Sequence, residues 1–411
     1  MTRSASKQLE CDVAIVGAGA VGLSLALALD VAGVTSVVVA RDNAPTNKTK
    51  DFDGRAYSIA LGCWRMWETL GLTEALADGA EPVVKVSAGA GNGPSIVFDQ
   101  DDLDEFDDPL GYMVEAHALN YALWKAAKAA ENVTVLSRTE LQDFEVNPAD
   151  VTLTAGGRLI SASLLVGCDG RGSVVRKKSG VKYTGHDYDA TGMVATVTLK
   201  TSHDGVARQK FLPSGPFAVL PLTENRANLI WSERNAVAET MMAMGQKDFE
   251  AELNARVGDF LGDFTTLGPR FAYPLIMRIA DSFIAPRIAL AGDAAHAIHP
   301  LAGQGLNLGL RDVAALVDTI KEAQTCGLDI GSEIALQPYE AARRTDTVTM
   351  STGMSALNAL FKAPAPVRAV SDLGMKLAGK SSLLRRAFTR EAAGLSGDIA
   401  ALFRGEDITP G

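Results

Sequence analysis

The sequence predicts an α/β fold in which a parallel-sheet domain is interrupted by an antiparallel-sheet domain and followed by a helical carboxyl-terminal region. Two observations carry this prediction. Three short apolar segments lie far apart in the chain, and each runs into a turn rich in glycine or aspartate, as buried parallel strands do. Between the second and third segments, residues 181–275 alternate apolar and polar side chains, which is typical of an antiparallel sheet.

The first segment, Cys11–Val16, leads into GAGAVG and then into a run of Leu and Ala that predicts a helix. Gly17, Gly19 and Gly22 have the GxGxxG spacing. The first permits a tight turn, the second lets the backbone approach a pyrophosphate, and the third lets helix and strand pack closely. The pattern predicts dinucleotide binding at the amino end of the helix, with a plain glycine turn as the alternative.

The second strand, Ser36–Ala40, departs from the usual dinucleotide-binding pattern. An acidic residue about 20 positions beyond the glycines normally binds the ribose. Ala40 stands there instead. Either Asp42 reaches the ribose or that hydrogen bond is missing, and Arg41 would instead favour a phosphate. This motif alone therefore does not separate FAD from NAD(P).

The next apolar segment, Leu159–Val166, runs into Asp169 and Gly170. Open α/β sheets bind ligands at the carboxyl ends of their strands, so the carboxylate is placed to accept from ribose hydroxyls. The alternative is that it caps a helix beginning near Ser173. The residues alone leave both interpretations open.

The last apolar segment, Arg287–Ala291, runs into a glycine and Asp293, which is placed for the hydroxyl of a sugar alcohol. Gly303 and Gly305 then precede a predicted helix, and Pro300 fixes the backbone ahead of it. A helix start of this kind can host an anion or the polar edge of a ring.

Three such turns, at 17–22, 169–170 and 292–305, favour FAD over NAD. FAD carries a ribityl chain and an isoalloxazine ring, so it needs contacts beyond one glycine turn. The alternative is that three unrelated loops occur in one large enzyme.

Together, the motifs GAGAVG, CDGRGS and GDAAHAIHPLAGQGLNLGLRD resemble those of the flavoprotein aromatic hydroxylases of the para-hydroxybenzoate hydroxylase type. The run from His299 to Asp312 is similar to the signature of one branch, the ubiquinone-biosynthesis hydroxylases. The resemblance covers about residues 11 to 390. It implies an FAD/NAD(P)-binding Rossmann-like domain. It also implies a monooxygenase that hydroxylates a polyprenyl phenol.

The resemblance further implies how such an enzyme works. NAD(P)H reduces FAD without a separate nicotinamide domain, O2 gives a flavin C4a-hydroperoxide, and an electron-rich phenol attacks its distal oxygen. The flavin-facing turn would contain Pro300, Gly303, Gln304 and Gly305. The sequence identifies no general base, because His296 and His299 are better explained as structural hydrogen-bonding groups.

The motifs and the resemblance together predict the cofactor-binding residues Gly17, Gly19, Val21, Gly22, Arg41, Asp42, Arg55, Asp169, Gly170, Gly292, Asp293, Gly303, Gly305, Leu306 and Asn307. No metal ligands are predicted. The order of the motifs predicts an FAD-binding domain, a substrate-binding sheet domain and a helical region. The FAD-binding domain would comprise residues 1–80, 110–180 and 280–330, and the substrate-binding sheet domain residues 81–109 and 181–279. The helical region would comprise residues 331–411.

The net charge, the cysteines and one basic segment indicate which partners and which cellular compartment to expect. The net charge of −10 argues against nucleic acid as a partner. The four cysteines form no CxxC and predict reduced, buried thiols in a cytoplasmic protein. Residues 361–390 are basic and amphipathic, which suggests peripheral contact with an anionic surface, the inner membrane face, or with an acidic partner. The alternative is a helix packed on the flavin domain. A biosynthetic complex or a homo-oligomer is a separate expectation.

Three rival functions stay open. One is another FAD-dependent aromatic hydroxylase or a prenyl-chain oxidoreductase. A second is a non-haem iron hydroxylase using Asp293, His296 and His299, although metal ligands would not explain GAGAVG. A third is a flavin-binding protein that catalyses nothing and serves a biosynthetic complex.

Overall fold

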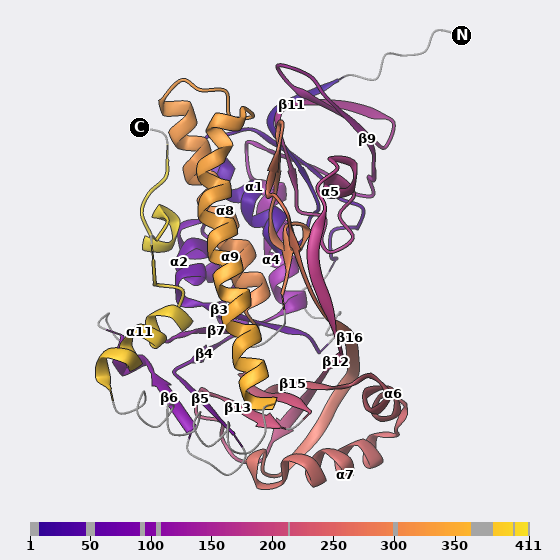
Figure 1. Cartoon of the computed structure of the whole chain (residues 1–411), viewed down its shortest axis with the longest axis vertical. Coiled ribbons are helices and arrows are strands. Elements are labelled where there is room, and N and C mark those ends of the chain that lie inside the picture. The colour runs from indigo at the N-terminus through magenta and orange to yellow at the C-terminus, as the bar shows by residue number, and fades with distance from the viewer. Residues whose placement is uncertain are drawn as a thin grey trace.

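The computed structural model describes residues 8–46, 54–90, 95–103, 108–212, 214–298, 303–362, 381–397 and 399–409. Figure 1 shows two large parts stacked along the long axis of the molecule. A mainly parallel sheet with its helices forms one part, and a broad, mostly antiparallel sheet backed by α6 and α7 forms the other. This arrangement confirms the predicted fold class.

The parallel sheet brings the three apolar segments of the sequence side by side. Its strands follow the order β17-β18-β11-β1-β2-β8. The register pairs Val16 with both Val39 and Gly167, and Gly167 in turn with Leu290. The carboxyl ends of these strands therefore meet at one edge, and so do the turns that follow them. The strands are β1 (Leu9–Val16), β2 (Ser36–Val39), β8 (Val133–Leu136), β11 (Arg158–Gly167), β17 (Ile284–Ala285) and β18 (Ile288–Leu290).

Helices cover this sheet because their side chains are too apolar for solvent. Helix α1 carries Leu and Ala almost throughout and is buried from Gly22 to Leu29. It packs between α4 and α8, and the indole of Trp67 donates to Ser24 Oγ at 3.0 Å. The helices of this part are α1 (Ala20–Val31), α2 (Leu61–Thr69), α3 (Thr73–Leu76), α4 (Ala116–Ala129), α5 (Val174–Lys178), α8 (Gln304–Thr325) and α9 (Glu333–Lys362).

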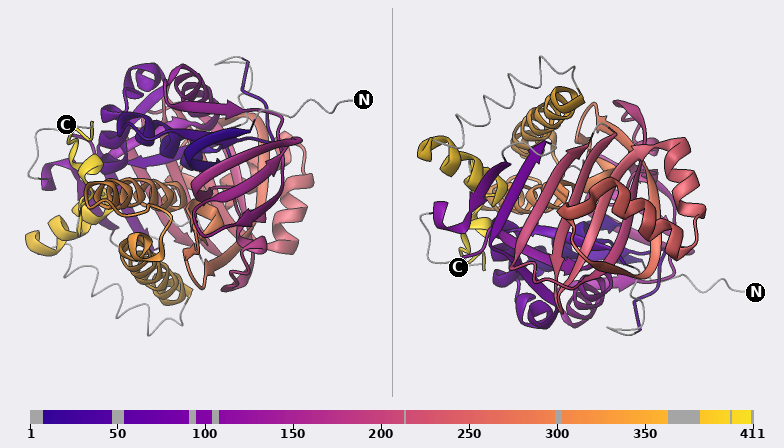
Figure 2. Two further views of the ribbon diagram at one scale, coloured as in Figure 1. Left: turned by 90° about the horizontal axis from the view of Figure 1, so that it is seen from above. Right: turned by 90° about the horizontal axis from the view of Figure 1, so that it is seen from below.

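The second sheet follows the order β19-β16-β12-β15-β14-β13-β5-β6. Phe217 and Trp231 lie in the core between this sheet and the helices α6 (Asn235–Ala243) and α7 (Gln246–Val257). Figure 2 shows these helices lying across the face of the sheet seen from below. The strands are β5 (Lys85–Ala90), β6 (Ser95–Asp99), β12 (Tyr183–Leu199), β13 (Val206–Leu212), β14 (Gly215–Leu222), β15 (Arg226–Arg234), β16 (Phe264–Ala280) and β19 (His296–Ala297).

One pair in this sheet departs from the antiparallel expectation. Strands β13 and β5 run parallel, from Val206 opposite Lys85 to Phe211 opposite Ala90. More than one hundred residues separate the two strands, including most of the parallel-sheet part. Strand direction is therefore not dictated by a short hairpin, and a long crossover permits parallel pairing.

Smaller elements join the two parts. Strands β3 (Ala56–Ala60), β7 (Gly111–Glu115) and β4 (Ala80–Val83) form a three-stranded sheet. The hairpin of β9 (Leu141–Val146) and β10 (Val151–Ala155) extends β11, and α11 (Ser382–Ala392) lies beside β6. No helix among the described residues is long and apolar enough to cross a membrane.

The cysteines only partly match their predicted burial. All four are free thiols. Cys63 is buried and Cys11 and Cys168 are half-buried, but Cys326 is exposed because it follows the last turn of α8.

Candidate active site

Two adjoining hollows lie at the edge of the parallel sheet where the three turns meet. The first hollow has a volume of about 440 Å³, and the second about 480 Å³. Both are within the range of ligand pockets, roughly 300–1,000 Å³. They share Gly19, Cys168 and Gly170 in their walls, so they are neighbours along one surface.

The first hollow is bounded by the ends of β1, β2, β8 and β11 and by their loops. Its predicted residues are Gly17, Gly19, Arg41, Asp42, Asp169 and Gly170. The second hollow lies between the start of α8, in the parallel-sheet part, and the inner face of the second sheet. Its predicted residues are Gly19, Val21, Arg55, Gly170, Gly292, Asp293, Gly303, Gly305 and Leu306.

The GAGAVG turn is built as its spacing predicts. Gly17 has φ of +114°, and a Cβ there would lie 2.3 Å from Cys168 O. A Cβ on Gly22 would lie 2.0 Å from Gly17 O, so this glycine serves helix packing and does not line either hollow. A Cβ on Gly19 would meet nothing within 4 Å, and no side chain caps the start of α1 there. The amino end of α1 therefore keeps backbone N–H groups for an anion.

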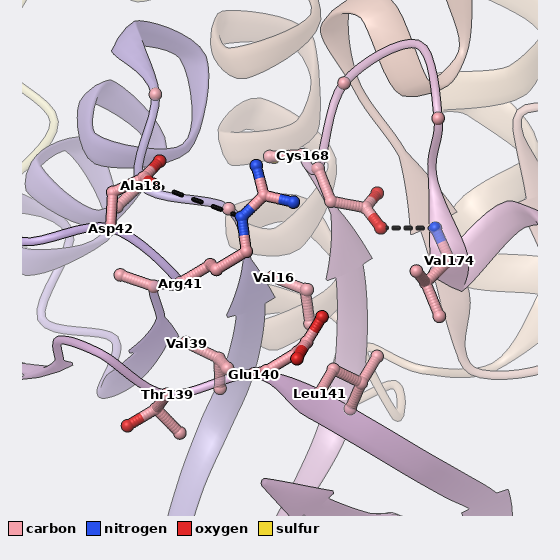
Figure 3. A pocket seen from close by; sticks show the side chains of 16 residues that line it. Val16, Ala18, Val39, Arg41, Asp42, Thr139, Glu140, Leu141, Cys168 and Val174 are labelled. Carbon is pink, nitrogen blue, oxygen red and sulfur yellow. Dashed lines mark hydrogen bonds and ion pairs between the residues drawn. The ribbon is translucent and has the colours of Figure 1, made fainter. Parts of the chain in front are cut away.

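Asp169 fulfils the capping interpretation. Its Oδ2 accepts from Val174 N at 2.6 Å and from Val175 N at 3.2 Å, as Figure 3 marks at Val174. Ser173 adds a second cap to the same helix through Arg176 N. The carboxylate also lies in the wall of the first hollow, so capping fixes the orientation of a residue at the ligand surface.

The acid expected at the end of β2 has no direct substitute on that strand. Arg41 and Asp42 both line the first hollow, but their side chains are 79% and 83% exposed and only 4.0 Å apart. Glu140 also lines the first hollow, from the loop after β8. Sequence reasoning missed it, since its nearness to Ala40 depends on the pairing of β2 with β8.

A buried network of charges holds the turn after β18. Asp312 is fully buried, and its Oδ2 accepts from Gly292 N at 2.8 Å and from His296 Nε2 at 2.6 Å. Its Oδ1 accepts from Arg343 Nε at 2.8 Å. Burial alone would raise the pKa of the Asp312 carboxyl, but His296 and Arg343 outweigh it and hold the pKa below its usual range.

Asp293, by contrast, is open to solvent. Its side chain is 43% exposed, and its Oδ2 pairs with Arg171 Nε at 3.2 Å beside the second hollow. The carboxylate and the guanidinium thus line the same wall, and both can reach a polar ligand.

The start of α8 differs in detail from its prediction. Gly303 is the residue before the helix, with φ of +67° and no side-chain cap, but Gly305 lies inside the first turn. Gln304 does not line either hollow. Asn307 is buried and accepts from Ala60 N at 3.0 Å while donating to Ser58 O at 2.9 Å, so its amide fixes β3 behind the wall. Pro300 lies outside the described residues.

The second sheet supplies the opposite wall of the second hollow. Val194, Asn228, Ile230 and Tyr273 line it from β12, β15 and β16. Burial raises the pKa of the Tyr273 hydroxyl, and the nearby charge of Arg171 offsets this in part. No motif marks these residues, because alternating strands give the same pattern whichever face they present.

The proposed histidine and aspartate metal set does not assemble among the described residues. The described residues contain no group of three or more His, Cys, Asp or Glu side chains that could hold a metal ion. His296 is turned into the buried network with Asp312, and His299 lies outside the described part of the chain.

Comparison with known proteins gives consistent similarities. Residues 10–346 match the family model described as "FAD binding domain". The ubiquinone hydroxylase UbiL of Rhodospirillum rubrum is 39% identical over 396 residues, which cover 96% of this chain and 91% of that protein. The 3-demethoxyubiquinol 3-hydroxylase of Escherichia coli is 34% identical over 396 residues, covering 93% and 98%.

Solved structures show the same fold. The p-nitrophenol 4-monooxygenase PnpA of Pseudomonas putida superposes with a TM-score of 0.78 at 21% sequence identity, over 95% of this chain and 100% of that chain.

Proposed function

We propose that the two hollows are the two ends of one FAD site, because this chain belongs to the FAD-dependent hydroxylases of ubiquinone biosynthesis. The chain is an FAD-dependent aromatic monooxygenase that uses NAD(P)H and acts on a prenylated phenol with O2. The observation that carries the site proposal is that three turns, distant in sequence, meet at adjoining hollows.

The residues of the two hollows fit an FAD molecule. The uncapped amino end of α1 beside Gly19 suits the pyrophosphate, and the crowding around Gly17 keeps that turn free of side chains. Asp169, whose Oδ2 caps α5, would lie near the pyrophosphate, and Asp293 would accept from hydroxyls of the ribityl chain. The uncapped start of α8 at Gly303 would donate backbone N–H groups to the polar edge of the isoalloxazine.

When bound, FAD supplies electron transfer and oxygen activation. The chain itself binds, orients and shields the reactants. Val194, Ile230 and Tyr273 face the parallel-sheet part across the second hollow, so a phenol ring would lie between this wall and the flavin. The apolar side chains there would exclude water from the reacting ring.

We further propose that the substrate is of the 2-octaprenyl-6-methoxyphenol type, on the basis of the motif resemblance. The name of the Escherichia coli relative makes a demethoxyubiquinol the second candidate. Purified FAD-loaded protein should be given NAD(P)H, O2 and each compound, and the products analysed by mass spectrometry. We expect one hydroxylated product for each NAD(P)H oxidised with the preferred compound. NAD(P)H oxidation that never yields hydroxylated product with any prenylated phenol would contradict the assignment.

The chain would meet its lipid substrate through α11. In this helix Leu383, Leu384 and Phe388 are 78%, 44% and 51% exposed, beside the basic residues Arg385 and Arg386. Arg385 Nε pairs with Asp102 at 2.8 Å, which holds the helix against the body of the protein. Exposed apolar groups beside cations suit an anionic bilayer surface. The rest of the predicted 361–390 stretch lies mostly outside the described residues.

Co-sedimentation with vesicles of anionic lipid tests this contact. Changing Leu383 and Phe388 together to Gln should release the protein from the pellet. Ile334→Gln, at a 72% exposed site on α9, should leave partitioning unchanged. Equal partitioning of all three proteins would rule out α11 as the membrane contact.

A further inference from the structure

Binding of an adenosine ribose at the first hollow lacks its customary acceptor. Strand β2 ends at Val39, and the next residue is Ala40, which is almost fully buried and carries no polar side-chain atom. Ribose hydroxyls at this place are usually held by a carboxylate that ends the second strand. The chain must therefore supply that carboxylate from elsewhere or leave the hydroxyls to solvent.

Three acidic side chains line the first hollow: Asp42, Glu140 and Asp169. Asp169 uses its Oδ2 to cap α5 through two backbone N–H groups, and its Oδ1 is buried away from the surface of the hollow. The Asp42 carboxylate already faces a cation, because its Oδ1 lies 4.0 Å from Arg41 Nε. Glu140 is the remaining acid.

The backbone brings Glu140 directly beside the end of β2. Strand β8 pairs in parallel with β2, and Ala40 N donates to Leu136 O at 3.0 Å. The chain then turns back, so that Thr139 N donates to Ala40 O at 2.8 Å. On its other side, Glu140 O accepts from Gly156 N at 3.3 Å. Residue 140 is thus tied to the strand end and to the next hairpin.

The Glu140 side chain is available for a ligand. It is exposed, and it makes no hydrogen bond or ion pair with any residue that the structure describes. Figure 3 shows its carboxylate on the wall of the first hollow, between the labelled positions of Val16 and Leu141. A free carboxylate at this point can accept hydrogen bonds from two neighbouring hydroxyls.

We infer that the Glu140 carboxylate accepts the hydrogen bonds of the adenosine ribose in this chain. It takes the place of the acid that is missing at position 40, and it comes from the loop after the neighbouring strand β8. The inference rests on the proposed FAD site. It assigns the specificity for the adenosine ribose to a residue about one hundred positions downstream of the second strand. The side chain makes no structural contact, so its replacement should leave folding unchanged.

Titration of the FAD-free protein tests this inference, with FAD and with an FAD analogue whose adenosine ribose lacks both hydroxyls. Wild-type protein should bind FAD about tenfold more tightly than the analogue. Glu140→Ala should reduce this ratio to near one by weakening FAD alone, and Glu140→Gln should give an intermediate ratio. Asp42→Asn is the matched control and should keep the full preference. Thermal unfolding of each FAD-free variant verifies that folding is unaffected.

The outcomes separate the inference from the function it rests on. An undiminished preference in Glu140→Ala, or its loss in Asp42→Asn, would overturn the role of Glu140 while leaving the FAD site intact. If wild-type protein bound neither ligand, the FAD site itself would be wrong.

Discussion

The two hollows are made of different parts of the chain. The first lies entirely among the strand ends and turns of the parallel-sheet part, where Gly19, Gly170 and Gly172 would each have room for a Cβ. The second is built largely of side chains, among them Arg55, Asp293 and residues of the second sheet. Phosphates can be bound by backbone N–H groups, whereas rings and substrates are selected by side chains. This difference explains why the turns around both hollows leave motifs in the sequence, whereas the wall that the second sheet adds to the second hollow leaves little trace.

The largest effect is expected beneath the second hollow, at Asp312→Asn. The change leaves the buried Arg343 without one of its two carboxylates and removes the charge that faces His296. Loss of one partner of a buried pair costs about 3–5 kcal/mol, and urea unfolding should show a fall of that order in the free energy of unfolding. Asp293→Asn is the control, because its pair with Arg171 is about half exposed, and it should cost less than about 1 kcal/mol. Equal losses would show that the buried network does not support the turn.

The glycines of the GAGAVG turn should divide into two kinds. Gly22→Ala places a methyl group 2.0 Å from Gly17 O, and such overpacking should lower the free energy of unfolding by about 1–3 kcal/mol. Gly19→Ala meets nothing within 4 Å, so its stability should match wild type while its FAD affinity falls. Urea unfolding of FAD-free protein and FAD titration measure the two effects. The backbone account of the first hollow fails if Gly19→Ala binds FAD as tightly as wild type.

The smallest effect is expected at Tyr273→Phe in the second hollow. The ring packs over Gly192, where a Cβ would lie 2.7 Å from its Cε2, and its hydroxyl makes no hydrogen bond within the described chain. Burial raises the pKa of this hydroxyl, so it remains a donor at neutral pH. Its loss should raise KM for a prenylated phenol by about 3- to 10-fold. FAD affinity should not change.

Tyr121→Phe provides the matched control, since this residue lies on α4 and does not line either hollow. Its KM should equal that of wild type. A Tyr273→Phe variant with weakened FAD affinity and unchanged KM would show that this wall contacts the cofactor and not the substrate.

The sequence predicted the strands and turns of the parallel sheet well because their signals are local. The Cys11–Val16 strand, the tight turn at Gly17 and the helix after it depend on neighbouring residues alone. Register then aligned the carboxyl ends of β1, β11 and β18, which the motifs had placed on one edge. The fold class and the chemistry of the family followed from these features.

Other parts could not be predicted from local patterns. Glu140 lies near Ala40 only because β8 pairs with β2, and Tyr273 reaches the second hollow only through the register of β12 with β16. The parallel pairing of β5 with β13 likewise depends on a long crossover. Asn307 belongs to the motif that resembles the family signature, yet its side-chain amide hydrogen-bonds the backbone of β3. The residues in this contact lie about 250 positions apart in the chain.

The most direct test of the central claim, that the two hollows together hold one FAD, is a competition titration of FAD-free protein. We expect one FAD per chain, displaced both by ADP, which fits the first hollow, and by FMN, which fits the second. AMP and FMN, the two halves of FAD, should also bind together, because each occupies its own hollow. Protein that binds no FAD, or FAD whose binding is unaffected by ADP, would contradict the claim.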